Sequence, residues 1–219
     1  MIYIMDNFTL VNKSIICIAK RNSGKSELIK YLVKKSIQNN EFNKIFVYST
    51  TNCVNEFYNT FICEKCIFSN YSEDWTNKLI DIMTLKNKGK TKQSQNPYNI
   101  LIILDDMASD ISMHHSESIK KLYTRGRYSF ISIIVLGQQL VHVSPIMRNN
   151  SDYILCGQLN ASNIEQLCDS YRVPLINKKE FIKLYKELTN NYKFMVINNN
   201  TVKDSDNINS FYGWIKAEI

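Results

Sequence analysis

Residues 19–26 decide the fold, and they read Ala19-Lys20-Arg21-Asn22-Ser23-Gly24-Lys25-Ser26. A short apolar run at residues 14–18, typical of a buried strand, comes before them, and an apolar pattern with helical spacing at residues 27–33 follows. Strand, small-residue loop, Gly-Lys-Ser and helix are the layout of a P-loop, whose backbone amides form a cradle for phosphates. The stretch therefore predicts a nucleotide-dependent motor, kinase or switch.

The P-loop residues have distinct expected roles. Lys25 is expected to reach the β- and γ-phosphates, and Ser26 is expected to place its hydroxyl on Mg²⁺. A chance match at a helix start is the alternative, and the flanking strand and helix argue against it. We expect the nucleotide to contact the whole stretch, namely Ala19, Lys20, Arg21, Asn22, Ser23, Gly24, Lys25, Ser26 and Glu27.

Apolar strand patterns alternate with helical patterns along most of the chain, which predicts an α/β fold with a largely parallel sheet. Strands are expected at residues 15–18, 44–49, 99–104, 130–136, 152–156, 193–197 and 211–216. Helices are expected at residues 26–37, 75–85, 116–123, 163–171 and 178–188, and residues 57–68 are compatible with a short helix and a short strand. With no internal repeat and no linker in the sequence, residues 1–219 are predicted to form a single domain.

Two adjacent acids follow a fully apolar strand, Leu101-Ile102-Ile103-Leu104. The strand should carry Asp105 to the carboxyl edge of the sheet, where ligands bind in open α/β folds. Asp105 is expected to hold the Mg²⁺ shell, mainly through water. Asp106 is the candidate that orients the attacking water, and a helix N-cap or turn is its alternative role.

A glutamine and three arginines complete the candidate site. Gln138 follows the strand expected at 130–136, and at the tip of that strand it could contact the γ-phosphate. A plain turn at the end of the strand is the alternative. Arg125, Arg127 and Arg148 flank that strand, and an arginine from a neighbouring subunit can stabilise charge on the γ-phosphoryl group. For each arginine alone, a surface salt bridge is the competing interpretation.

Charge, cysteine spacing and hydropathy limit the partners, metal sites and membrane segments that the chain can have. The formal net charge of +7 suits either nucleotide binding with a lysine-rich surface or a nucleic-acid partner. The basic stretch at 86–97 is expected to be a surface connection, with DNA contact as the alternative.

Cys63 and Cys66 have metal-ligand spacing without a second pair of ligands, and His114 and His115 are expected to be solvated. The sequence has no apolar run of about 18 residues and no secretory signal pattern, so we expect no membrane span.

Taken in order, these motifs resemble the genome-packaging ATPases of large DNA viruses, virophages and Polinton-like elements, the poxvirus-type branch of the FtsK–HerA superfamily. The resemblance runs from residue 15 to 217. It rests on Ala19-x4-Gly-Lys-Ser, Leu-Ile-Ile-Leu-Asp-Asp-Met (101–107), Leu-Tyr-Thr-Arg-Gly-Arg-Tyr-Ser (122–129), Ile-Ser-Ile-Ile-Val-Leu-Gly-Gln (131–138), Ser-Pro-Ile-Met-Arg-Asn-Asn (144–150) and two terminal strand patterns at 192–198 and 211–217.

The resemblance implies a RecA-like P-loop NTPase fold, a three-layer sandwich with a mostly parallel central sheet and an added catalytic strand. It implies a ring of five or six subunits around double-stranded DNA. ATP hydrolysis with Mg²⁺ would pump the DNA into a preformed capsid, with capsid or portal-vertex proteins as partners. The implied location is the viral factory in the host cytoplasm, and the virion.

By matching position, Lys25, Ser26, Asp105, Asp106 and Gln138 inherit the ATPase roles given above. Arg125, Arg127 and Arg148 match arginines of the pattern, with the one that acts in trans left open. The chain departs from the family at Ala19, where Gly is more usual, and at Tyr128, where His is frequent, so that a role for this His does not transfer.

Three other functional classes compete with the motor. A P-loop kinase for a small molecule lacks support, because no compact arginine-rich lid is present. A GTPase is disfavoured because Asn87-Lys88-Gly89-Lys90 lacks the Asp of the guanine motif. A non-catalytic scaffold that only binds nucleotide is disfavoured by the intact Lys25, Ser26 and Asp105.

Overall fold

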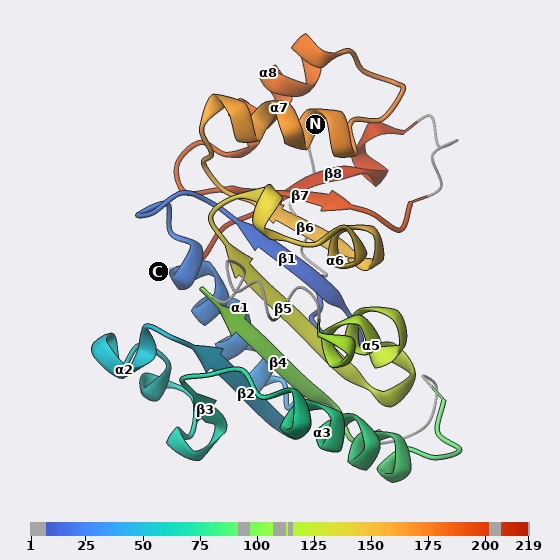
Figure 1. Cartoon of the computed structure of the whole chain (residues 1–219). Coiled ribbons are helices and arrows are strands. Elements are labelled where there is room, and N and C mark those ends of the chain that lie inside the picture. The colour runs from blue at the N-terminus through green and yellow to red at the C-terminus, as the bar shows by residue number, and fades with distance from the viewer. Residues whose placement is uncertain (1–7, 92–96, 107–112, 114–115, 202–206, 219) are drawn as a thin grey trace.

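The computed structural model describes residues 8–91, 97–106, 113, 116–201 and 207–218. An eight-stranded sheet in the order β3-β2-β4-β5-β1-β6-β7-β8 runs through the molecule (Figure 1). The strands are β1 (Ser14–Ile18), β2 (Lys44–Ser49), β3 (Ile67–Phe68), β4 (Ile100–Asp105), β5 (Ile131–Gly137), β6 (Tyr153–Cys156), β7 (Phe194–Asn198) and β8 (Tyr212–Ile215). Neighbouring strands pair in parallel from β3 to β6, whereas β7 and β8 pair antiparallel to the strand before them.

Helices cover both faces of this sheet. They are α1 (Lys25–Gln38), α2 (Asn52–Asn55), α3 (Glu73–Lys86), α5 (Glu117–Arg125), α6 (Pro145–Asn150), α7 (Ala161–Tyr171) and α8 (Lys178–Leu188). Short 3₁₀ turns are η1 (Tyr58–Thr60), η2 (Glu64–Cys66), η3 (Gly126–Ser129), η4 (Leu140–His142) and η5 (Ile208–Ser210). The predicted three-layer α/β architecture with a mostly parallel sheet is therefore confirmed.

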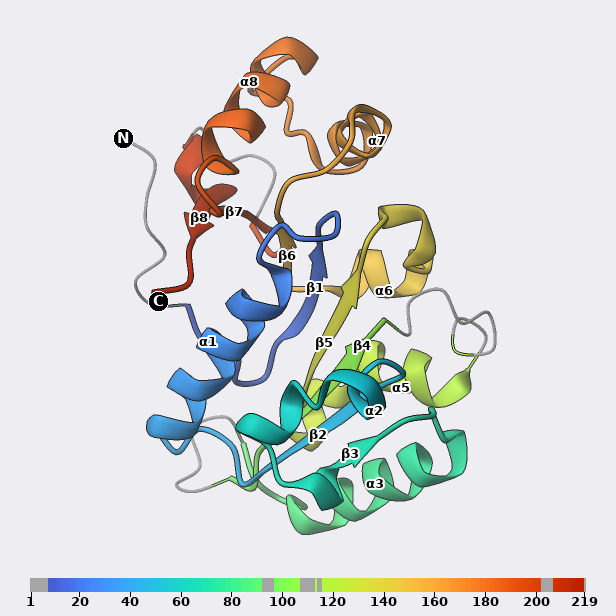
Figure 2. The same cartoon turned by 90° about the vertical axis from the view of Figure 1, so that its left-hand side faces the viewer.

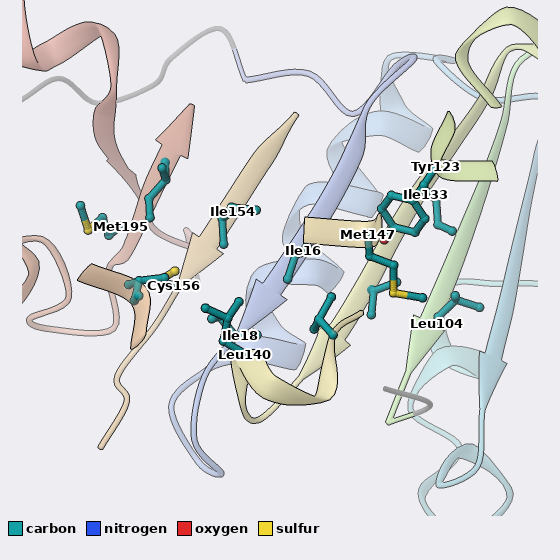
Figure 3. Close-up of a cluster of buried hydrophobic side chains, with 14 of the residues drawn as sticks. Ile16, Ile18, Leu104, Tyr123, Ile133, Leu140, Met147, Ile154, Cys156 and Met195 are labelled. Carbon is teal, nitrogen blue, oxygen red and sulfur yellow. The ribbon is translucent and has the colours of Figure 1, made fainter. Parts of the chain in front are cut away.

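Alternate residues of the central strands enter two separate cores. Ile15 and Cys17 of β1 join a cluster with α1, whereas Ile16 and Ile18 point to the other face. Figure 3 shows this second cluster, in which Met147 of α6 packs over the sheet beside Tyr123 of α5. All five residues of β1 are buried, because both faces of the parallel sheet are covered.

Helix α1 forms because four apolar residues recur at helical spacing: Leu28, Ile29, Leu32 and Val33 are all buried against the sheet. Figure 2 looks onto the edge where β1 and β4 end, and it shows α1 leaving that edge along one face of the sheet. The helix N-terminus thus lies at the carboxyl edge, which is where the sequence predicted a phosphate cradle.

The observed elements match the expected ones apart from small shifts at their ends. The ambiguous segment 57–68 holds η1, η2 and the short β3, as its mixed pattern suggested. Two short helices, α2 and α6, were not expected, since each is too short to show a periodic pattern. The start of α6 is nevertheless encoded locally, because the Ser144 hydroxyl accepts from the Met147 amide and Pro145 occupies the first turn.

None of the helices in the described part of the chain combines the length and apolar character that a membrane span requires.

Candidate nucleotide-binding site

The P-loop runs from the end of β1 at Ile18 to the start of α1 at Lys25. Gly24 has φ +85°, a left-handed conformation that glycine adopts without strain, and a Cβ there would lie 3.3 Å from Cδ1 of Tyr192. No side chain caps the N-terminus of α1. The amides of its first turn are therefore available to an anion, and the helix dipole favours negative charge at the same place.

Backbone bonds fix the first half of the loop to neighbouring strand ends. The Ala19 amide donates to the Gly137 carbonyl at 3.2 Å, and the Lys20 amide donates to the Gln158 carbonyl at 2.9 Å. Inside the loop, the Ser23 hydroxyl donates to the Lys20 carbonyl at 2.6 Å. The cradle is thus attached to the ends of β5 and β6 by hydrogen bonds of its own backbone.

A cavity of about 440 Å³ opens in front of this loop. Its lining brings together the loop residues Lys20, Arg21, Asn22, Ser23, Gly24, Lys25, Ser26 and Glu27 with Asp105, Asp106 and Gln138, and adds Thr51, Asn55, Phe57 and Tyr58. The sheet order explains this convergence, because β5 lies between β1 and β4 and all three strands end at one edge. Ala19 is fully buried and is not among the lining residues, so its part is structural.

Asp105 is the last residue of β4 and only 6% exposed. The Tyr58 hydroxyl donates to its Oδ2 at 2.8 Å. Burial raises the pKa of the Asp105 carboxyl above its usual range, and the neighbouring charge of Asp106 raises it further. The hydrogen bond from Tyr58 and the positive charge of Lys25 lower the pKa and partly oppose this rise. The carboxylate is therefore incompletely compensated inside the protein, which suits a site that receives a cation.

Asp106 is half-buried and has φ +55°, which is uncommon for a residue other than glycine. This left-handed turn ends β4 and leaves Asp106 in the cavity lining next to Asp105. Of its two predicted alternative roles, the turn agrees with this backbone, whereas the helix N-cap concerns residues 107–112, which lie outside the described residues. Aspartate adopts the left-handed conformation more readily than most residues, so the turn involves little strain.

Gln138 follows β5 directly and is half-buried in the cavity lining. Lys25 donates from Nζ to the Gly137 carbonyl at 3.3 Å, one residue away. The lysine thus rests against the end of β5 and faces the cavity that Asp105 also lines. A phosphate chain in that cavity would meet the ammonium group of Lys25 at one end of β5 and the amide of Gln138 beside it.

Four lining residues were not predicted: Thr51, Asn55, Phe57 and Tyr58. They belong to the segment after β2, which pairs with β4 and ends at the same edge. Asn52 organises the segment, since its Oδ1 accepts from the Tyr58 amide at 2.8 Å and its Nδ2 donates to Asn59 at 2.7 Å. The rule that ligands gather at strand ends could have identified this segment, whereas composition could not.

The structure does not bring the three candidate arginines into this cavity. Arg127 forms an ion pair with Asp152, Nη1 to Oδ1 at 3.2 Å, and Asp152 Oδ2 accepts from the amide of Ser14, the first residue of β1. That position is the amino edge of the sheet. Arg125 ends α5 just before η3 and β5, and Arg148 accepts through its carbonyl from Asn199, which follows β7 at the same edge. A role for any of them at a nucleotide requires a second subunit.

The residues present fit a nucleotide with Mg²⁺. The uncapped helix N-terminus, the left-handed Gly24 and Lys25 suit a phosphate chain. The buried carboxylate of Asp105 and the hydroxyl of Ser26 are the hard oxygen donors that Mg²⁺ prefers. Together these groups have the chemistry that a phosphate chain and one divalent cation require.

Other predicted features lie apart from the site or outside the described residues. Cys17 and Cys156 are fully buried core residues, and burial raises the pKa of the Cys17 thiol to about 12. Cys63 is exposed and Cys66 partly buried, and the described residues hold no group of three or more His, Cys, Asp or Glu side chains arranged for a metal. His114 and His115 lie outside the described residues, as does part of the basic stretch at 86–97.

Comparisons with known proteins agree with this fold. The model of a family described as Poxvirus A32 protein matches residues 5–212. Uncharacterized protein 075L of Invertebrate iridescent virus 6 is 29% identical over 214 residues, which cover 95% of this chain and 80% of that protein.

Two solved structures share the fold. One is the genome packaging NTPase B204 from Sulfolobus turreted icosahedral virus 2 in complex with ATP-gammaS, with a TM-score of 0.60, 16% identity and coverage of 86% of this chain and 92% of that chain. The other is B204, the DNA-packaging ATPase from Sulfolobus Turreted Icosahedral Virus, with a TM-score of 0.63, 15% identity and coverage of 88% and 95%. At these identities the likeness is evidence of fold, and it confirms the predicted P-loop NTPase architecture.

Proposed function

Because the chain belongs to the Poxvirus A32 protein family, we propose that it is an ATPase motor that drives double-stranded DNA into a viral capsid. The observation that carries the proposal is the convergence of the P-loop, Asp105, Asp106 and Gln138 on one cavity. The fold shared with packaging NTPases that bind ATP analogues supports it. The kinase alternative has no comparable support, since the solved structures that share the fold are described as genome-packaging enzymes.

Each side chain in the cavity has a part in this proposal. The P-loop amides and Lys25 bind the phosphates and hold the γ-phosphoryl group next to β5. Ser26 and Asp105 would hold Mg²⁺, which supplies positive charge against the phosphate oxygens. Asp106 accepts a proton from the attacking water and orients it, and Gln138 responds to the presence of the γ-phosphate.

The motor is proposed to act as a ring of five or six copies of this chain, with residues 1–219 as a single ATPase domain. In a ring, the amino edge of one subunit can approach the carboxyl edge of the next. Arg125, Arg127 or Arg148 would then stabilise charge on a neighbour's nucleotide. Duplex DNA and a capsid or portal-vertex protein are the proposed partners, and the proposed place of action is the viral factory in the cytoplasm of the infected cell, with the virion as a second place.

ATP turnover with and without long duplex DNA tests this function. We expect Mg²⁺-dependent hydrolysis that long duplex DNA stimulates and that rising salt suppresses, because phosphate contacts release counterions. Lys25→Ala is the control that separates this activity from a contaminant, and it should abolish turnover. Hydrolysis that ignores DNA while a small-molecule phosphate acceptor stimulates it would contradict the motor and favour a kinase.

A further inference from the structure

An exposed tyrosine stands against the P-loop in a strained turn. Tyr192 is 63% exposed, so most of its ring lies outside the core. It follows Asn191, and both residues have left-handed backbones, with φ values of 55° and 59°. Asparagine tolerates this conformation, but a bulky aromatic residue does not adopt it without a cost in free energy. Something other than core packing therefore accounts for a tyrosine at this position.

The turn is firmly anchored, so the ring has a defined place. The Lys193 amide donates to the Asn190 carbonyl at 3.1 Å and closes the turn. Lys193 also places its ammonium group 4.0 Å from the ring centre of Trp214, which ties the start of β7 to β8. Tyr192 lies against Gly24, because its Cδ1 is 3.3 Å from where a Cβ of that glycine would be. The strained turn thus holds an aromatic ring at Gly24, the one glycine of the phosphate cradle.

The sheet order shows which part of a nucleotide could meet this ring. Asp105 and Gln138, at the ends of β4 and β5, belong with the terminal phosphate, and they lie on one side of β1. The turn with Tyr192 leads into β7, on the other side of β1. Figure 2 shows α2 on one side of the start of α1 and β7 with α8 on the other. A nucleotide whose γ-phosphate points to the acids must direct its base away from them, toward β6 and β7.

We propose that the ring of Tyr192 is the platform on which the nucleobase stacks, so that the turn between α8 and β7 supplies the base-binding part of the site. This inference rests on the proposed ATPase function and adds the recognition of the base to it. Aromatic faces bind bases by stacking, and the exposed ring requires no rearrangement of the core to do so. Phe57, the half-buried aromatic residue of the cavity lining, follows α2 on the side of the acids, where the terminal phosphate is expected.

The test compares ATP with inorganic tripolyphosphate, which has the phosphates but no base. We expect Tyr192→Ala to raise the KM for ATP about tenfold, the loss of one stacking contact, and to leave the inhibition constant of tripolyphosphate unchanged. Tyr192→Phe keeps the ring and should keep the KM of the unmodified chain. Tyr192→Leu keeps the bulk beside Gly24 without an aromatic face, and it should weaken ATP binding as the alanine variant does.

Tyr128, which is 83% exposed and precedes β5 at the amino edge, offers a matched control. Tyr128→Ala should change neither constant. An unchanged KM in Tyr192→Ala overturns the stacking platform, as does an equal loss for ATP and tripolyphosphate, which would mean that the ring only supports the P-loop. Absence of ATP turnover in the unmodified chain contradicts the proposed function instead, so the two failures are distinguishable. If the alanine variant does not fold, the comparison of Phe with Leu decides.

Discussion

Burial disfavours the charge of the residue proposed to hold Mg²⁺, and a hydrogen bond from another segment opposes this effect. The Tyr58 hydroxyl donates to Asp105 inside the protein, at 2.8 Å. It favours the ionised carboxylate, whereas burial and Asp106 favour the protonated form. Asn52 holds the Tyr58 backbone in turn. The charge state of Asp105 therefore depends on a residue in a different segment of the chain.

Removing that hydroxyl should be visible in the pH profile. Tyr58→Phe takes away a group that lowers the Asp105 pKa, so the pKa rises further above its usual range. Because Asp105 must be ionised to hold a cation, the acidic limb of kcat/KM for ATP should move to higher pH. Tyr123→Phe is a matched control, since no hydrogen-bond partner of the buried Tyr123 hydroxyl is found in the described residues. Identical profiles for both variants would contradict the role of Tyr58.

Asp105→Asn should separate stability from activity. The pKa of the buried carboxyl is raised on folding, so ionisation at neutral pH opposes the folded state. We expect the variant to melt at a higher temperature than the unmodified chain at pH 7, without nucleotide, and to lose ATP turnover. The difference in Tm should shrink as the pH falls through the raised pKa of the folded state, and it should vanish below about 3.9, the ordinary pKa of aspartate, because the carboxyl is then protonated in both states. An unchanged or lower Tm of Asp105→Asn at pH 7 would contradict the unfavourable ionisation of Asp105 in the folded protein.

At the scale of elements, the position of β5 determines the site. It lies between β1 and β4, so that Gln138 and the Gly137 carbonyl separate the P-loop from Asp105. At the other end of these strands, Asp152 joins several segments. It accepts from the Ser14 amide, from Arg127 and from Asn200, and is 2% exposed. This cluster fixes the starts of β1 and β6, and thus the register that aligns their ends.

The Arg127–Asp152 pair is expected to support the fold. Arg127→Ala leaves a buried carboxylate with weaker compensation, which we expect to lower the free energy of unfolding by about 1–3 kcal/mol. The arginine side chain is 42% exposed, which keeps the loss below that of a fully buried pair. Denaturant unfolding measures this change in the free energy of unfolding. The control is Arg125→Ala at an exposed position, whose free energy of unfolding should stay within about 0.5 kcal/mol of the unmodified chain. Equal stability of both variants would leave Arg127 free for a purely intersubunit role.

At the scale of the whole molecule, the two edges of the sheet carry different chemistry. The carboxyl edge holds the nucleotide cavity, and the amino edge holds Arg125 and Arg127. The seven residues of β5 separate them by about 20 Å, at the rise of an extended strand. No side chain spans that distance, so an arginine from the amino edge can reach a nucleotide only in another subunit.

Mixing experiments test this arrangement. Arg125→Ala and Arg148→Ala subunits are each mixed with unmodified subunits at a fixed total concentration. If one of these arginines acts in trans within a ring, a minority of that variant should suppress ATP turnover by more than its share of subunits. Light scattering with a non-hydrolysable ATP analogue should report a ring of five or six subunits under the same conditions. A linear decline with the variant's share for both arginines would contradict a trans role for either.

Much of this site could be predicted because its signals are local. Gly24-Lys25-Ser26 lies between a strand and a helix in the sequence itself, and Asp105 and Gln138 each follow a continuous apolar run. Such runs become buried parallel strands, whose ends meet at one edge. Tyr58 gave no such signal, because 47 residues separate it from Asp105 and the segment between β2 and α3 has no periodicity.

The order of residues along the chain by itself determined the α/β class, the phosphate cradle and the acids that face it, since local spacing dictates which backbone becomes strand, loop or helix. Only the tertiary structure decided which distant groups meet. It brings the Tyr58 hydroxyl into a hydrogen bond with Asp105, Arg127 into an ion pair with Asp152, and the ring of Tyr192 against Gly24. These contacts depend on the order of strands in the sheet and on which face each helix covers, and both follow from packing of the whole chain, which no short stretch encodes.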